Sequence, residues 1–415
     1  MTSYLEKHSF TGPIFDPPNF VPAIIICLPA LNEPRLLETI QSLAQAKLQY
    51  PDNVLVIVLF NHSELAEESI KTANQKAFSN FAKAVDKYQS NDFRWAAALM
   101  ELPKKHAGVG LARKILMDEG VRLFALAEKE NGILAAMDGD STVAPNYFRA
   151  INDFFEMHPK LEAASIHFEH PLPATEGERS AIIQYELHLR YFVEAQKMTG
   201  LPTAYQTIGS SMAVRQKAYQ LQGGMNKRKA GEDFYFLQKF ARKGTLGNLT
   251  NTTVYPSARI SDRVPFGTGR AIGKLLTDEP QLTSHALIIF DQIKQLFDEM
   301  PRIWDKKSGE IRQYMTRLHP AVQDFLAENG FLERVQDAQK HTASQAAFLK
   351  RFYSWFDAFL MMKYVHFARD NYYPDEPIGT VAYQFTAREW NYTGPKQDLE
   401  QLLNVYRLAN TKCSP

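Results

Sequence analysis

The chain has 415 residues, of which 45% are apolar and 22% are charged. This is the composition of an ordinary globular protein, which excludes a disordered chain and a collagen-like repeat, and the length predicts about two or three domains. Lysine and arginine number 47 against 46 aspartates and glutamates, for a net charge of +1. The chain as a whole therefore lacks the positive charge typical of nucleic-acid-binding proteins.

The N-terminus and the cysteines bear on the cellular compartment. Residues 1–10 lack the basic and apolar segments of a signal peptide, and the longest apolar run, Ala23–Ala30, is far shorter than the ~20 residues that span a bilayer. The only cysteines, Cys27 and Cys413, do not make a disulfide framework. We expect a cytoplasmic protein without a transmembrane segment, and peripheral contact with a membrane stays open.

The order of predicted elements indicates an α/β fold. Residues 1–20 are rich in proline and aromatic residues and predict an irregular arm on the surface. Apolar runs then alternate with helical patterns, with strands predicted near 23–28, 54–60, 96–101 and 133–137 and helices near 36–43, 64–88 and 110–130. This alternation predicts βαβ units, that is, a Rossmann-like, mostly parallel sheet flanked by helices.

From about residue 276 the apolar residues recur at helical spacing, so residues 276–415 predict a mostly helical C-terminal region. We therefore expect an arm at 1–20, an α/β domain at 21–275 and a helical region at 276–415. The aromatic segment 347–369 could dock on a lipid surface, although its few polar residues favour a buried helix.

The loop after the first predicted strand, Pro29–Glu33 (PALNE), places polar side chains at the carboxyl end of that strand. Ligands of open α/β sheets bind at this edge, so Asn32 and Glu33 are candidates for binding a nucleotide base or ribose. The alternative is a strand-to-helix turn in which one of them caps the next helix.

Two carboxylates, Asp138 and Asp140, directly follow the apolar run Ile133–Met137. Carboxylates at this spacing can share a hard cation such as Mg²⁺ or Mn²⁺, and substrate phosphates often complete its shell. Because the two acids would repel each other without a cation, the motif (DGD) predicts a metal–diphosphate site. The alternative is a simple Asp-Gly turn.

The segment Gly231–Phe234 begins a predicted helix and puts Glu232 and Asp233 in its first turn. The positive end of the helix dipole favours ionised carboxylates there, as a general base at neutral pH requires. Acidic residues also occupy helix N-termini for stability alone, so both interpretations stay open.

Three further segments contain glycine or arginine in suggestive positions. Gly108–Lys114 resembles part of a phosphate loop but lacks the third glycine of the dinucleotide fingerprint. The small residues of Gly209–Arg215 leave room for a ligand or meet a packing constraint. Arg263–Arg270 frames a glycine-containing loop whose guanidinium groups could bind phosphate or simply belong to a basic interdomain loop.

In this order, PALNE, DGD and GED resemble the motifs of family 2 glycosyltransferases with a GT-A fold, over roughly residues 21–275. The resemblance implies transfer of a single sugar from a nucleotide diphosphate sugar, with UDP-sugars favoured, to an acceptor hydroxyl. It also implies Mn²⁺ or Mg²⁺ as the cofactor and inversion at C1.

The resemblance further implies a role for each motif residue. Asp233 would be the general base, Glu232 would position donor or acceptor, and Asp138 and Asp140 would hold the metal. The nucleotide and donor would be bound by Pro29, Leu31, Asn32, Glu33, Asn61, Arg113, Lys114, Asp138, Arg263 and Arg270.

The sequence departs from the family pattern in two places. Family members often carry an acidic residue after the second strand, where this chain has Asn61; an amide can still bond a base, but the identity of the nucleotide stays open. The expected lack of membrane spans and of a processive-synthase motif favours a discrete acceptor. No nucleic-acid partner is expected, and a homo-oligomer stays open.

Two other functions compete with this interpretation. A nucleotidyltransferase can use a related fold and acidic metal site, but it needs a glycine-rich phosphate signature near the first strand, which PALNE lacks. An inactive nucleotide-sugar-binding scaffold would not need Asp138, Asp140 and Asp233, all of which are present.

Overall fold

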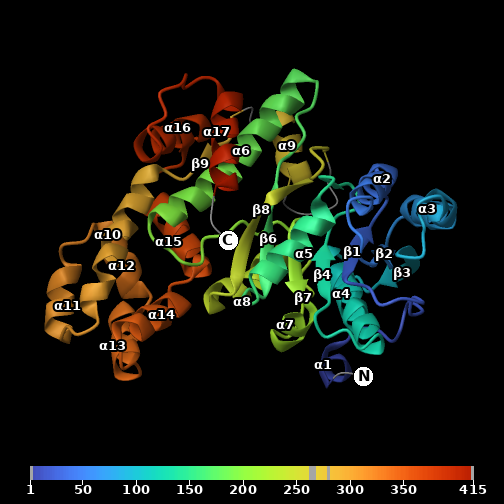
Figure 1. The fold of residues 1–415 in the computed structure, drawn as a ribbon. Coiled ribbons are helices and arrows are strands. Elements are labelled where there is room, and N and C mark those ends of the chain that lie inside the picture. Colours follow the sequence, from blue (N-terminus) through green and yellow to red (C-terminus); the bar gives the residue numbers. More distant parts are fainter. Residues whose placement is uncertain (1–2, 261–267, 278–280, 413–415) are drawn as a thin grey trace. The chain divides into compact units, whose positions relative to one another are not determined.

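The computed structural model describes residues 3–260, 268–277 and 281–412 (Figure 1). The chain forms two compact units. The first comprises residues 1–174, 207–273 and 409–415, and the second comprises residues 175–206 and 274–408. The division into 1–20, 21–275 and 276–415 stays a prediction.

The first unit is built on an eight-stranded sheet with the strand order β3-β2-β1-β4-β7-β6-β8-β5. Its strands are β1 (Ile24–Ala30), β2 (Val54–Ser63), β3 (Phe93–Leu102), β4 (Ile133–Ala136), β5 (Thr142–Val143), β6 (Ala163–Phe168), β7 (Met212–Arg215) and β8 (Leu246–Tyr255). β1 pairs in parallel with β2 and β4, β2 with β3, and β6 with β8, whereas β7 runs antiparallel to β4 and β6 and β5 antiparallel to β8. The expected α/β fold with a mostly parallel sheet is confirmed.

Helices cover both faces of this sheet. The helices of the first unit are α1 (Ser3–His8), α2 (Leu36–Lys47), α3 (Glu68–Asp86), α4 (Val109–Leu126), α5 (Tyr147–Met157), α7 (Gln216–Leu221) and α8 (Glu232–Lys243), and α9 (Thr268–Thr277) crosses into the second unit. α4 packs on β1, β2 and β4, while α3 packs on β2 and β3, and α2 and α5 pack on β5 and β8 respectively and on each other.

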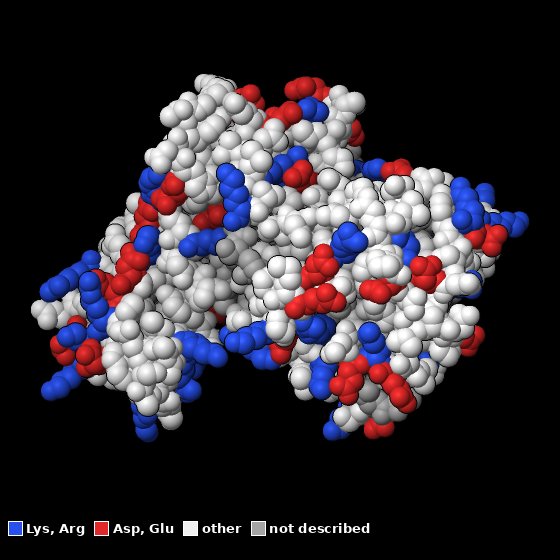
Figure 2. Space-filling view, in the orientation of Figure 1, with Lys and Arg blue, Asp and Glu red and all other residues white. Residues whose placement is uncertain are grey.

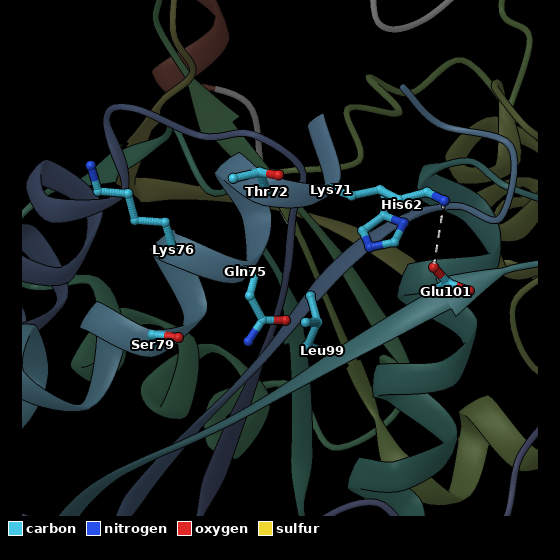
Figure 3. A pocket seen from close by; sticks show the side chains of 8 residues that line it. All are labelled: His62, Lys71, Thr72, Gln75, Lys76, Ser79, Leu99 and Glu101. Atoms are coloured by element: carbon cyan, nitrogen blue, oxygen red, sulfur yellow. Dashed lines mark ion pairs between the residues drawn. The ribbon is translucent and has the colours of Figure 1, made fainter. Parts of the chain in front are cut away.

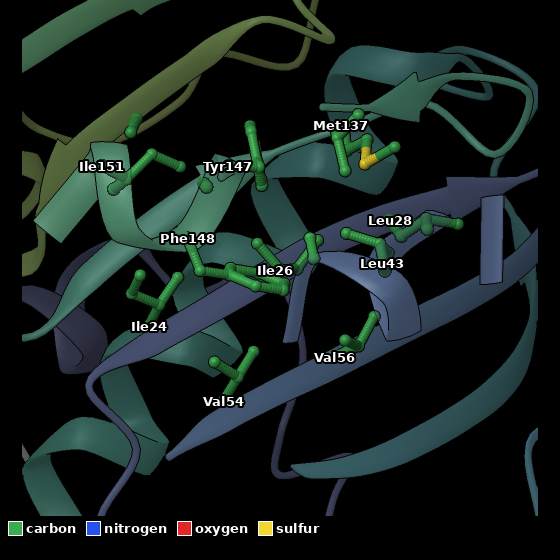
Figure 4. Packing of buried hydrophobic residues seen from close by; sticks show 14 of the residues in the cluster. Ile24, Ile26, Leu28, Leu43, Val54, Val56, Met137, Tyr147, Phe148 and Ile151 are labelled. Carbon is green, nitrogen blue, oxygen red and sulfur yellow. The ribbon is translucent and has the colours of Figure 1, made fainter. Parts of the chain in front are cut away.

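The main core lies between the sheet and the layer formed by α2, α3 and α5 (Figure 4). Alternate residues of the central strands, such as Ile24 and Ile26 of β1 and Val54 and Val56 of β2, enter this cluster. The residues between them are also buried, including Ile25 and Leu55. Burial on both faces explains why these strands are continuous apolar runs without polar alternation.

The N-terminal arm differs from the sequence prediction. Residues Ser3–His8 form α1 instead of an irregular segment. The Tyr4 hydroxyl donates to Asp118 of α4 over 2.8 Å, and the Phe15 amide donates to Glu119 of α4 over 2.9 Å. The arm thus docks on α4 through both its helix and the residues that follow it.

The second unit is mostly helical, as expected for the C-terminal region. It contains α6 (Glu176–Met198), α10 (Leu287–Ile303), α11 (Ser308–Met315), α12 (Pro320–Glu328), α13 (Phe331–Lys340), α14 (Gln345–Trp355), α15 (Ala358–Asn371), α16 (Ile378–Glu389) and most of α17 (Leu399–Thr411), with the two-residue strands β9 (Thr283–Ser284) and β10 (Glu376–Pro377). In the aromatic segment, Phe348, Phe352 and Phe356 are buried. The structure thus places these rings in the core of the second unit.

The surface carries both signs of charge. Figure 2 shows basic and acidic side chains interspersed over the visible face, as expected for a net charge of +1. Throughout the described part of the chain, we find no helix with the length and apolar character needed to cross a membrane.

Candidate active site

The strand register brings the first two motifs to one edge of the sheet. Cys27 of β1 is opposite Ala136 of β4, so PALNE and the DGD loop lie side by side, although Pro29 and Ala30 belong to β1 and not to the expected loop. A Cβ at Gly139 would lie 3.2 Å from Cγ of Glu33 and 3.4 Å from the carbonyl oxygen of Pro29. A side chain at position 139 would therefore fit only if Glu33 shifted slightly.

Arg259 links one carboxylate from each of these loops. Its Nη2 lies 2.6 Å from Oε2 of Glu33, and its Nε lies 3.3 Å from Oδ2 of Asp140. Burial raises the pKa of Glu33, although Arg259 counteracts this rise. Burial, reinforced by the charges of Asp138 and Glu33, raises the pKa of Asp140 to about 7.

Arg113 of α4 links the other carboxylates. Its Nη1 donates to Oε1 of Glu232 and its Nη2 donates to Oδ1 of Asp138, and its side chain is only 3% exposed. A Cβ at Gly209 would lie 2.1 Å from Nη1 of Arg113. The guanidinium of Arg113 therefore fills the space left by the small residues before β7. This agrees with the expectation that these residues meet a packing constraint.

The first turn of α8 carries two perturbed carboxyl groups. Gly231, in the left-handed region with φ 70°, precedes α8, and Gly244 with φ 74° follows it; glycine adopts this conformation without a steric penalty. Burial raises the pKa of Glu232 to about 7, opposed by Arg113. Burial also raises the pKa of Asp233, again opposed by Arg113. A carboxylate of raised pKa accepts a proton more readily than an exposed one.

Asparagines organise the ends of β1 and β2. β2 extends to Ser63, so Asn61 lies within the strand, and its amide nitrogen donates to the carbonyl oxygen of Ala30 over 3.3 Å. Asn32 has a φ of 45°, and its backbone amide donates to Oδ1 of the fully buried Asn74 over 2.6 Å. The side chain of Asn61 thus joins neighbouring strands, and Asn74 fixes the PALNE turn.

Among the remaining predicted residues that the structure describes, Lys114 and Arg270 do not contact these carboxylates. Lys114, one residue after Arg113, forms an ion pair of 2.9 Å with Asp118 and lies beside Tyr4. Arg270 lies exposed on α9, and Arg263 falls outside the described residues. Pro29 and Leu31 lie at the end of β1 and directly after it.

Sequence reasoning missed Arg259, Asn74 and Thr39, whose hydroxyl donates to the carbonyl oxygen of Gly139 over 2.8 Å. Asn74 and Thr39 lie within helices and carry no motif. Arg259 lies four residues before the Arg263–Arg270 segment. Its position next to that arginine-rich segment is the one sequence signal that points to it.

The residues of DGD fit a divalent cation. Asp138 and Asp140 supply oxygen donors, the ligand type that Mg²⁺ and Mn²⁺ prefer, and burial, followed by the charges of Asp138 and Glu33, raises the pKa of Asp140. Among residues 3–260, 268–277 and 281–412, no three or more His, Cys, Asp or Glu side chains are grouped to hold a metal ion. A cation here would thus need further ligands from substrate or water.

A separate cavity of about 530 Å³ lies between α3 and the ends of β2 and β3 (Figure 3). Its walls are His62, Lys71, Thr72, Gln75, Lys76, Ser79, Leu99 and Glu101. Because successive strand residues point to opposite faces, His62 faces this cavity while Asn61 points away. The cavity contains none of the candidate carboxylates, so we do not assign the chemistry to it.

Several solved structures share a distant likeness with this chain. TarS (residues 1–349) of S. aureus, in complex with UDP-GlcNAc, is 13% identical with a TM-score of 0.40, covering 82% of this chain and 92% of that chain. The glucosyl-3-phosphoglycerate synthase of M. tuberculosis is 14% identical with a TM-score of 0.32, covering 63% and 85%. A mannosyltransferase of Pyrobaculum calidifontis, in complex with GDP-Man and Mn²⁺, is 14% identical with a TM-score of 0.34, covering 98% and 90%.

No curated protein matches this chain. The model of the family "Glycosyl transferase family group 2" matches residues 133–367. The match includes DGD, the first turn of α8 and Arg259, and it confirms the resemblance drawn from the motifs. Because the match extends over more than half of the chain, the protein belongs to glycosyl transferase family group 2 and is a glycosyltransferase.

Proposed function

We propose that this glycosyltransferase moves a single sugar from a nucleotide diphosphate sugar, with UDP-sugars favoured, to an acceptor hydroxyl, with inversion at C1 and with the help of Mn²⁺ or Mg²⁺. The observation that carries the proposal is the convergence of three motifs. Arg113 joins Asp138 to Glu232, and Arg259 joins Asp140 to Glu33.

Asp233 is the general base in this proposal. The acceptor oxygen forms a bond to C1 of the donor sugar, its proton passes to the Asp233 carboxylate, and the C1–O bond to the diphosphate breaks. The nucleoside diphosphate leaves with the bonding electron pair. A positioned base contributes roughly 10²–10⁴-fold to the rate. A single displacement with the base on the face opposite the leaving group inverts C1.

The carboxylates of DGD would hold the cation, with Asp140 on the diphosphate and Asp138 near the ribose or donor sugar. A bound divalent cation would neutralise charge on the departing diphosphate. Glu232, fixed by Arg113, would position donor or acceptor. We propose a nucleotide pocket formed by Asn32, Glu33 and the backbone of Pro29–Leu31, while contacts from Asn61, Lys114, Arg263 and Arg270 stay predictions.

We further propose that residues 21–275 form the catalytic domain, with residues 1–20 as an arm and residues 276–415 as a helical region. A cytoplasmic location is part of the same proposal. The acceptor is defined only by its hydroxyl group.

A donor panel tests the proposal. Thermal unfolding is measured with UDP- and GDP-sugars, with and without Mn²⁺, because a ligand that binds the folded state raises its stability in proportion to RT ln(1 + [L]/Kd). We expect one UDP-sugar to stabilise the protein in the presence of Mn²⁺, and Asp140→Asn to abolish that cation dependence. No stabilisation by any nucleotide sugar would contradict the proposed donor class.

The reaction itself is tested with the donor so identified. We expect release of a nucleoside diphosphate, whereas a nucleotidyltransferase would release pyrophosphate and a scaffold would release neither. Asp233→Asn should lower kcat by roughly 10²–10⁴-fold with little change in donor affinity, and exposed Asp86 offers a control, Asp86→Asn. A near-normal kcat for Asp233→Asn would exclude Asp233 as the base.

A further inference from the structure

The two arginines of the site are held very differently. Arg113 is 3% exposed and its guanidinium lies against the backbone of Gly209, so it cannot move without unpacking the site. Arg259 is 26% exposed and lies four residues beyond the end of β8. Its side chain contacts Oε2 of Glu33 at 2.6 Å and Oδ2 of Asp140 at 3.3 Å.

The contacts of Arg259 use atoms that a cation would need. A divalent cation at the DGD loop binds carboxylate oxygens, and Oδ2 of Asp140 already accepts a hydrogen bond from Arg259. The Glu33 carboxylate, 4% exposed, holds the other end of the guanidinium. A guanidinium cannot lose its charge in a protein, so it repels a second cation at the same oxygens at any ordinary pH.

We propose that Arg259 is the built-in counter-ion of Asp140 and Glu33, and that a divalent cation binds at the DGD loop by displacing it. This inference rests on the proposed function, because it needs the cation site at Asp138 and Asp140. Arg259 is thus a positioning residue: it keeps the acidic loops together without a cation. When displaced, its guanidinium is available to the diphosphate, for which it has a matching bidentate geometry.

The proposal has a structural consequence for affinity. Without nucleotide, the cation must break the charge-assisted contact between Arg259 and Asp140 before it binds, and this lowers its affinity. Removing the guanidinium should therefore tighten cation binding by the protein alone. A residue that merely stabilised the carboxylates in a binding geometry would have the opposite effect.

The affinity of the protein for Mn²⁺ alone tests the displacement of Arg259. Mn²⁺ is added to the full-length protein without nucleotide, and the electron paramagnetic resonance signal of free Mn²⁺ measures how much stays unbound. We expect Arg259→Gln to lower the Kd for Mn²⁺ by about tenfold or more, the factor associated with one charge-assisted hydrogen bond. Arg259→Lys, which keeps the charge but not the fork of donors, should fall between wild type and Arg259→Gln. It also serves as the second variant if Arg259→Gln folds poorly.

Arg35 provides the matched control. It is an arginine of the same region whose side chain contacts Glu38 and Ser257, and its charge acts on Asp140 only from a distance. Arg35→Gln should therefore change the Kd for Mn²⁺ by only about twofold to threefold, as expected for a screened charge. Equal effects of Arg35→Gln and Arg259→Gln, or weaker binding in Arg259→Gln, would overturn the inference.

Asp140→Asn distinguishes a failure of the proposed cation site from a failure of the proposed role of Arg259. If Asp140→Asn binds Mn²⁺ as tightly as wild type, or if neither wild type nor Arg259→Gln binds it, the proposed cation site is wrong and the inference falls with it. If Asp140→Asn loses Mn²⁺ while Arg259→Gln matches wild type, the cation site stands and only the role of Arg259 is refuted.

Discussion

Arg113 on α4 and Glu232 at the start of α8 form an ion pair whose side chains are 3% and 2% exposed. The same guanidinium pairs with Asp138 of the DGD loop. A single buried side chain therefore sets the spacing between one motif at the edge of the sheet and another at a helix N-terminus. The arrangement of the site should depend strongly on that side chain.

Replacing Arg113 tests this dependence. Arg113→Met leaves Glu232 buried without its guanidinium, and breaking a buried ion pair from one side costs about 3–5 kcal/mol of unfolding free energy. The double variant Arg113→Met with Glu232→Gln should be more stable than the sum of the single changes implies, because the two groups interact directly. Urea unfolding of all four proteins measures the coupling, and simple additivity would argue against it.

Gly209 tests the fit of the same guanidinium. A methyl group there would lie 2.1 Å from Nη1 of Arg113, so Gly209→Ala should displace Arg113 and lower the unfolding free energy by about 1–3 kcal/mol, as for other overpacked sites. We also expect lower transferase activity. Gly309→Ala is the control, because its Cβ meets nothing within 4 Å. Equal melting temperatures for the two variants would show that the site accommodates a methyl group.

The Glu232 carboxyl predicts a pH dependence of stability. Burial raises its pKa from the ordinary 4.5 to about 7, so the folded state binds this proton more tightly than the unfolded state. Its contribution to stability is complete below about pH 4.5 and is lost as the pH rises through about 7. Glutamine does not titrate, so the stability of wild type relative to Glu232→Gln should fall between about pH 5 and pH 8. A pH-independent difference in urea unfolding would contradict this.

In the second unit, we expect the buried ion pairs of Glu186 to contribute more to stability than a partly exposed ion pair. Its fully buried carboxylate accepts hydrogen bonds of 2.8 Å from Arg190 and from Arg407 of α17. Glu186→Gln removes the charge that both guanidinium groups share and should cost about 3–5 kcal/mol. Glu400→Gln affects only the partly exposed pair with Arg179 and should cost no more than about 1 kcal/mol. Similar losses in thermal unfolding would refute the contrast.

Much of the α/β unit could be predicted from local sequence. The apolar runs that became β1, β2 and β4 are buried on both faces, and such runs are recognisable without knowledge of their partners. Gly231 and Gly244 flank α8, and glycines at helix ends are also recognisable from the sequence. Motifs after strand ends could be located because parallel strands share one carboxyl edge.

Other features depended on partners distant in sequence. α6 lies between two segments of the first unit yet belongs to the second, and α1 forms through contacts with α4. Local patterns predicted neither, because the stabilising contacts come from residues about a hundred or more positions away.

The amino-acid sequence by itself determined the class of fold, the order of the motifs and the kind of chemistry, because these follow from hydrophobic periodicity and from residue types at strand ends. Only the tertiary structure decided which side chains meet. It paired Arg113 with Asp138 and Glu232, filled the space beside Gly209 and brought Arg259 to Asp140 and Glu33. Such pairings depend on how separate segments of the chain pack against one another, and no local pattern records that.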